Sequence, residues 1–111
     1  MTQSRIPHAE AKALYLRARQ LNVCAIGRAY GFAKPVEELH HKLHNTEPNR
    51  RRYPLLIHSL MNLVGVSRYW HTMHPYWGRP TLLEADKMEA FLRRHPQIAE
   101  RLNDPRTGEY T

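Results

Sequence analysis

The chain has 111 residues, which fits one domain with a modest hydrophobic core. Its 17 Lys and Arg against 10 Asp and Glu give a net charge of +7, which favours a polyanionic partner such as nucleic acid, an anionic membrane surface or an acidic protein. A single cysteine, no signal peptide and no apolar run long enough to span a bilayer predict a cytoplasmic protein that forms no internal disulfide and enters no membrane.

The apolar spacing of the first half predicts three helices. The first spans about 8–21, the second spans 22–31, and the third spans about 35–45. Gly31 supplies the left-handed residue that commonly ends a helix. The third segment has glutamates in its first turn and histidines with a lysine in its last turn, which is the charge order that the helix dipole favours.

The second half continues the helical pattern. After the loop 46–54, residues 55–64 are apolar almost all round and predict a central helix that is contacted on several sides. Ser67 is placed to cap another helix. Residues 81–84, Thr-Leu-Leu-Glu, have the spacing of a capping box and predict a helix from about 82, while Pro96 can open a last short helix.

These elements predict an all-α fold, a compact bundle of five to six short helices with one or two helix-turn-helix-like corners. We expect one helical domain over residues 1–103, made of a basic body (1–80) and C-terminal helices (81–103) that serve dimerisation. Residues 104–111 should form a flexible tail. No strand pattern is convincing, although six tyrosines and two tryptophans leave room for a short strand.

Two places fit the corner of a helix-turn-helix, where two helices with apolar inner faces meet at a short turn containing glycine. The first is residues 23–43, with Gly31 at the corner. Arg28 and Lys34 flank this corner and are candidates for nucleic-acid contact. Against this assignment, two glutamates at the start of the second helix would face the phosphates.

The second corner places Gly65 after the central helix, with Ser67 as the cap of a recognition helix. The side chains that would enter the major groove are Arg68, Tyr69, His71 and Thr72, and Ser67 is also a candidate for nucleic-acid contact. The run Gly-Val-Ser-Arg after an apolar helix resembles the corner of many bacterial helix-turn-helix repressors, which implies a DNA-binding function. The resemblance covers about fifteen residues. The alternative is a bend between core helices in a protein that never binds DNA.

A triple arginine, Arg50, Arg51 and Arg52, precedes the predicted central helix. Cations are disfavoured beside the positive end of a helix dipole, so we do not expect these residues to stabilise the fold. A bound phosphate would accept their bidentate hydrogen bonds and would also face the free N–H groups of the helix. The triple arginine is therefore a candidate phosphate contact, and a solvated loop is the alternative.

Eight histidines raise the question of metal binding or catalysis. His40 and His44 are one helical turn apart, as are His71 and His74, so a four-histidine site would form if the two helices met. The isolated cysteine and the lack of any catalytic motif argue against this assignment. We therefore expect no metal, no cofactor and no enzymatic activity, since histidines near phosphates need no metal.

The basic residues are concentrated in the front of the chain. Residues 1–80 carry twelve Lys or Arg against four acidic residues, whereas residues 81–111 carry five against six. We therefore predict a helix-turn-helix protein that binds double-stranded DNA, a small bacterial or phage transcriptional regulator, acting as a homodimer. The alternative is a small basic helical interaction protein, an inhibitor or adaptor of a mobile element, that docks on a protein or RNA partner through exposed aromatic residues.

Overall fold

A computed structural model describes residues 8–106 of the chain. At its centre, strand β1 (Glu38–His41) pairs antiparallel with strand β2 (Leu63–Val66). Within the described residues the helices are α1 (His8–Arg19), α2 (Ala25–Ala29), α3 (Glu47–Arg52), α4 (Arg68–Met73), α5 (Leu82–Arg94) and α6 (Pro96–Asn103). The fold is therefore α+β, and the prediction of an all-α bundle was wrong.

Strand β1 lies where the sequence predicted the third helix. Leu39 pairs with Gly65 in the ladder, and the pairing continues beyond β1 because the N–H of Glu37 donates to the carbonyl of Val66 at 2.8 Å. A favourable charge order along a helix contributes only a few tenths of a kcal/mol per charge. Hydrogen bonding to a distant segment outweighs that local preference, so residues 38–41 are extended.

The predicted central helix, residues 55–64, does not form either. Side chains bind its backbone groups: the Glu89 carboxylate accepts from the N–H of Leu55 at 3.1 Å and of Leu56 at 2.9 Å. The Asn62 side chain donates to the carbonyl of Ile57 at 3.1 Å. Residues 54–62 are consequently a series of turns that places Leu56 and Ile57 in the core.

Gly65 lies inside β2 and not at a helix corner. A Cβ atom at this position would lie 2.7 Å from Cγ1 of Val36, so the strand needs glycine for close approach to the neighbouring chain. The second helix-turn-helix corner is therefore wrong, because a strand replaces the helix that should precede it. The first corner, residues 23–43, is also wrong, because its second helix is β1.

Other local predictions are confirmed. The first helix, α1, has close to its expected bounds, and Gly31 has a φ of 87°. The Thr81 N–H donates to the Glu84 carboxylate at 2.9 Å and the Glu84 N–H donates to the Thr81 hydroxyl at 3.1 Å, which completes the capping box of α5. Helix α6 begins at Pro96 as expected. These signals are local, so the sequence alone was sufficient to locate them.

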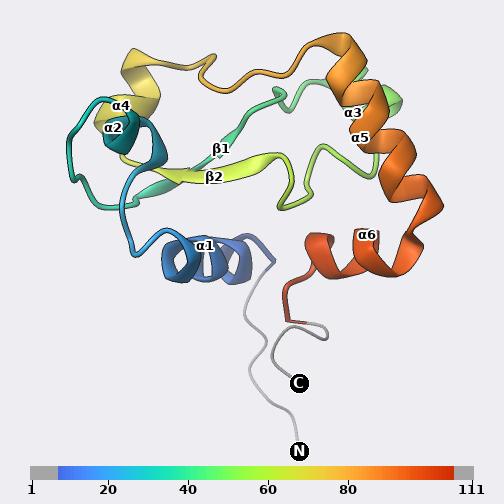
Figure 1. The fold of residues 1–111 in the computed structure, drawn as a ribbon, viewed down its shortest axis with the longest axis horizontal. Coiled ribbons are helices and arrows are strands. Elements are labelled where there is room, and N and C mark those ends of the chain that lie inside the picture. The colour runs from blue at the N-terminus through green and yellow to red at the C-terminus, as the bar shows by residue number, and fades with distance from the viewer. Residues whose placement is uncertain (1–7, 107–111) are drawn as a thin grey trace, which may run out of the picture.

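The apolar residues divide into two cores, one at each end of the sheet. Figure 1 shows α2 and α4 together at one end, with α3, α5 and α6 at the other and α1 alongside β2. The larger core contains Leu43, Tyr53, Leu56, Ile57, Ala85, Leu92 and Ala99. The smaller core contains Cys24, Ile26 and Val66, with Val64, Trp70 and Trp77 packed against it.

A glutamine side chain closes the outer edge of β2. The Gly65 N–H donates to Oε1 of Gln20 at 2.9 Å, and Nε2 of Gln20 donates to the Gly65 carbonyl at 3.0 Å and to the Val23 carbonyl at 2.8 Å. The amide of Gln20 thus takes the place of a neighbouring strand. It also fixes the end of α1 and the start of the chain that leads to α2.

The end of the described chain is tied to its beginning. The Pro105 side chain is fully buried, and the Asp104 carboxylate lies 3.2 Å from the His8 imidazole. The other residues of the expected tail, 107–111, lie outside the described residues. Dimerisation through residues 81–103 stays a prediction.

Replacing Asn62 by Ala should destabilise the fold strongly. Its buried side-chain amide accepts from the Leu43 N–H at 2.7 Å and donates to the carbonyls of Leu43 and Ile57 at 3.0 and 3.1 Å. Losing these bonds leaves buried backbone groups unpaired, so we expect a loss of about 2–4 kcal/mol in the free energy of unfolding. Urea denaturation measures it. A loss as small as that of the exposed control Gln97→Ala would contradict this role.

Candidate nucleic-acid interface

The interface is built where α2 packs on α4. The Cys24 sulfur accepts from the Gly27 N–H at 3.3 Å to cap α2, and the Ser67 hydroxyl accepts from the Trp70 N–H at 3.2 Å to cap α4. A Cβ atom on Gly27 would lie 3.0 Å from both Cδ1 and Nε1 of Trp70. Because Gly27 has no side chain, the indole can lie directly on the backbone of α2.

Several aromatic rings gather around this contact. Tyr30, Trp70 and His74 are nearly parallel, with ring centroids 4.9 to 5.6 Å apart. The Phe32 ring packs against Trp70 in a tilted orientation, with a centroid distance of 5.6 Å. Tyr69 meets Trp70 edge to face at 5.4 Å. We call the surface formed by residues 28–34 and 68–74 the α2–α4 face.

The outer rings of this face are open to solvent. Tyr30 is 52% exposed, Phe32 is 54% exposed and Tyr69 is 60% exposed, whereas Trp70 is partly buried beneath them. Neighbouring exposed aromatic rings form an apolar surface of the kind that marks an interaction site.

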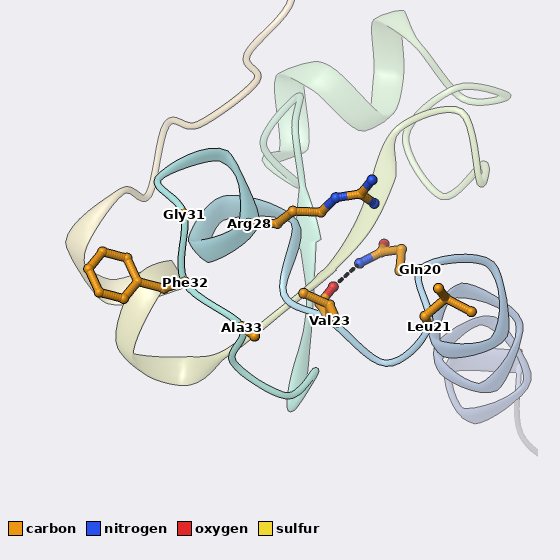
Figure 2. A pocket seen from close by; sticks show the side chains of 7 residues that line it. All are labelled: Gln20, Leu21, Val23, Arg28, Gly31, Phe32 and Ala33. Atoms are coloured by element: carbon orange, nitrogen blue, oxygen red, sulfur yellow. Dashed lines mark hydrogen bonds between the residues drawn. The ribbon is translucent and has the colours of Figure 1, made fainter.

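A hollow of about 380 Å³ adjoins the α2–α4 face, and Figure 2 shows the side chains around it. Arg28 extends from α2 toward Gln20, while Phe32 points the opposite way, toward α4. The full lining is Gln20, Leu21, Val23, Arg28, Gly31, Phe32 and Ala33. The hollow therefore offers an apolar floor with a guanidinium group beside it, and its volume lies within the usual range of small-ligand pockets.

The cations of the face are only weakly neutralised. Among residues 8–106, neither Arg28 nor Lys34 has an acidic side chain within ion-pair distance. Both side chains are exposed, and the Lys34 carbonyl accepts from the Cys24 N–H at 2.6 Å, which places Lys34 beside α2. Arg68 lies 3.5 Å from Glu38 and its side chain is 72% exposed. An anion can therefore approach all three cations from solvent.

The predicted α4 residues differ in what they can reach. Tyr69 is exposed, and Thr72 is exposed although its hydroxyl donates to the Arg68 carbonyl at 2.9 Å. His71 is turned toward β1, where its Nδ1 lies 2.8 Å from the Glu38 carboxylate. Ser67 is buried and serves as the cap. Arg28, Lys34, Arg68, Tyr69 and Thr72 are thus exposed on or beside the packed helices α2 and α4, with Arg28 on the side toward Gln20, whereas Ser67 is turned inward.

The triple arginine lies elsewhere. Its residues form the last turn of α3, where the helix dipole favours cations, so they do not precede a helix N-terminus as the sequence suggested. Arg50 donates to the carbonyl and side chain of Asn45, Arg51 pairs with Glu47, and Arg52 lies 3.2 Å from Asp86. Figure 1 places α3 beside α5, at the end of the sheet away from α2 and α4.

Histidines connect β1 with the chain after α4. The Nε2 atoms of His40 and His44 lie 2.7 and 2.8 Å from the carbonyls of Trp77 and Pro75. His41 faces His58 with a nitrogen-to-nitrogen distance of 3.3 Å. Within residues 8–106 no group of three or more His, Cys, Asp or Glu side chains is arranged to hold a metal ion. His40 and His44 thus hold the chain that follows α4, whereas His41 contacts the turn segment 54–62.

The aromatic part of the face was missed by sequence reasoning. The alternative function invoked exposed aromatic residues without placing them, and Tyr30, Phe32 and Trp70 were not among the candidate contacts. The signal that was present is the run Tyr30-Gly31-Phe32 directly after a helix of only five residues. So short a helix has little surface on which to bury two aromatic side chains.

No protein-family model, curated protein or solved structure matches this chain. Within residues 8–106, no helix combines the length and the apolar character needed to cross a bilayer. The function must therefore be argued from the charges, the exposed rings and the hollow of the α2–α4 face.

Replacing Gly27 by Ala should displace the indole of Trp70. The new Cβ would meet Trp70 at 3.0 Å and the Phe32 carbonyl at 3.2 Å, so the ring has to move. We expect an altered near-ultraviolet circular dichroism spectrum and a loss of about 1–3 kcal/mol in stability. Ala29→Ser, which also adds one heavy atom to α2 but at an exposed position, is the control. An unchanged spectrum for Gly27→Ala would contradict the packing.

The histidines predict a pH dependence of stability. Burial, assisted by the nearby His58, lowers the pKa of His41 to about 4, and burial also lowers the pKa of His40. The unfolded chain, with histidine pKa values near 6.5, then binds protons that the folded chain does not. Stability should therefore fall as the pH drops from about 6.5 to 4. Asp104, whose pKa is lowered to about 2 by its hydrogen bond with Arg106, loses its contribution only at lower pH.

His41→Gln should reduce this acid sensitivity. The glutamine takes up no proton in the folded or the unfolded state. The difference in unfolding free energy between pH 7 and pH 5 should therefore shrink, by on the order of 1 kcal/mol because solvent screens the half-buried ring. Thermal melts across this range give the measurement. His95→Gln, at an exposed histidine, is the control. Parallel curves for wild type and His41→Gln would count against the role of this ring.

Proposed function

We propose that the protein binds nucleic acid through the α2–α4 face. The observation that carries the proposal is the combination of open cations and exposed aromatic rings on one surface. Arg28 and Lys34 meet no acidic partner in the described residues, and Arg68 stands at the same face. The net charge of +7 favours a polyanion in general. Phosphates supply the anion, and bases supply flat rings that match the aromatic side chains.

The proposed binding does not use a helix-turn-helix. Strands β1 and β2 occupy the places of the helices that such a motif requires. Helix α4 has only six residues, which corresponds to a length of about 9 Å at 1.5 Å per residue. It projects Arg68, Tyr69 and Thr72 from the surface. These side chains contact the ligand as part of a broad face and not as a helix inserted into a groove.

Arg28 is the cation that lines the hollow. It lines the hollow together with Phe32, so its guanidinium group can hold a phosphate while the apolar floor accepts a ring (Figure 2). A guanidinium group binds phosphate through two parallel hydrogen bonds, which gives orientation as well as charge. Lys34 and Arg68 add electrostatic attraction for phosphates on the α2–α4 face. Arg50, Arg51 and Arg52, at the other end of the sheet, remain a separate proposed phosphate contact.

The test is the affinity for a labelled random-sequence oligonucleotide, measured by fluorescence anisotropy at several salt concentrations. Binding should weaken steeply as salt rises. The double variant Arg28→Ala with Lys34→Ala should lower the slope of log K against log salt by about 1.4–1.8, corresponding to two lost phosphate contacts. Its matched control is Arg94→Ala with Arg101→Ala, which removes the same charge from α5 and α6.

The control separates local contact from general charge attraction. If the α5–α6 double variant weakens binding as much as the α2–α4 double variant does, the assigned face is wrong. If the wild-type protein does not bind even at low salt, nucleic-acid binding itself is overturned. A pull-down for an acidic protein partner would then be the next experiment.

A further inference from the structure

The α2–α4 face carries information about which form of nucleic acid it fits. Three large rings, Tyr30, Phe32 and Tyr69, are more than half exposed within two short segments. Exposing neighbouring aromatic rings to water is unfavourable unless a partner covers them. Tyr30 is supported by Trp70 at 5.2 Å with an interplanar angle of 6°, so the exposed ring is held in place by the ring beneath it. The surface is thus prepared for ring stacking before any ligand binds.

Duplex nucleic acid cannot use such a surface well. Its bases are already stacked on one another, and a protein reaches only their edges in the grooves. Unpaired bases expose their flat faces, and aromatic side chains bind them by stacking with little regard to sequence. The flat, exposed rings of the α2–α4 face therefore match single strands and not duplexes.

The hollow adds a second matching feature. Phe32 and Arg28 line it together, and its volume of about 380 Å³ can receive one planar group at an apolar wall. The Phe32 ring points away from the Arg28 guanidinium group (Figure 2), so a base stacked on Phe32 and a phosphate held by Arg28 belong to different nucleotides of the strand, and Lys34 follows Phe32 two residues along the chain. Along residues 28–34 the cations Arg28 and Lys34 flank the two rings Tyr30 and Phe32, so stacking surfaces and positive charges occur together in one short segment, as single-strand binding requires.

We propose that the α2–α4 face binds single-stranded nucleic acid, with unpaired bases stacked on Tyr30 and Phe32 and the neighbouring phosphates held by Arg28 and Lys34, which flank the two rings along the chain. The inference rests on the proposed function and narrows its ligand. Stacking and phosphate contact make no use of the ribose 2′-hydroxyl, so single-stranded RNA and DNA are both ligands.

The first experiment compares a single-stranded oligonucleotide with its duplex by anisotropy at one salt concentration. The single strand, as RNA and as DNA, should bind at least about tenfold more tightly than the duplex, since one stacked base contributes about 1–3 kcal/mol. The double variant Tyr30→Leu with Phe32→Leu keeps apolar bulk but removes the aromatic rings. It should lower single-strand affinity about tenfold or more and leave the salt slope unchanged. Tyr76→Leu, at a tyrosine with 61% exposure outside the face, is the control.

A second measurement leaves the stacking rings intact, in case the double leucine variant unfolds α2. Trp77→Phe leaves Trp70 as the only tryptophan of the chain. Because Trp70 stacks on Tyr30, a single strand should change its fluorescence, whereas an equal concentration of duplex should not. No response to single strands would count against the proposal.

The outcomes separate the inference from the function beneath it. Salt-dependent binding that depends on Arg28 and Lys34 but is equal for single strand and duplex would overturn the inference and leave nucleic-acid binding in place. An unchanged single-strand affinity in a folded Tyr30→Leu with Phe32→Leu protein would also overturn it. Absence of any binding at low salt would overturn both the single-strand inference and the proposed nucleic-acid binding.

Discussion

The interface depends on one close contact, that of the Trp70 indole with the backbone of Gly27. The 3.0 Å separation between a Cβ at position 27 and the indole leaves no room for a side chain, so glycine lets α4 lie against α2. The indole in turn supports Tyr30 and Phe32 at the end of this five-residue helix, and His74 also packs against the Tyr30 ring. Below it, the small core around Ile26 holds the pair of helices to β2.

Fold prediction succeeded where the signal was local. The bounds of α1, the capping box at 81–84 and the start of α6 at Pro96 all follow from residues within a turn or two of each other. It failed for β1 and β2, because the pairing of Leu39 with Gly65 joins segments more than twenty residues apart. The apolar run at 55–64 was read as a helix, yet the Glu89 carboxylate, some thirty residues later, takes its first N–H groups.

The residues of the candidate site were also predictable only where the signal was local. Arg28, Lys34, Arg68 and Tyr69 were selected from two presumed corners, and all four are exposed on or beside the packed helices α2 and α4 although neither corner exists. The reason is that glycine, polar caps and exposed cations mark a turn at the surface whatever element precedes it. The exposure of Phe32 and its partners was not predictable, because it depends on how α4 packs on α2. Net charge indicated a polyanion but could not show which surface would meet it.

The central claim is that nucleic acid contacts the α2–α4 face, and chemical-shift mapping tests it most directly. A titration of the isotope-labelled protein with a short single-stranded oligonucleotide should perturb the backbone amides of residues 28–34 and 68–74 and the indole N–H of Trp70. The chemical shifts of the backbone amides in α5 and α6 should not change, because these helices lie at the other end of the sheet (Figure 1). Perturbations concentrated on α3, α5 and α6, with residues 28–34 unchanged, would contradict the account.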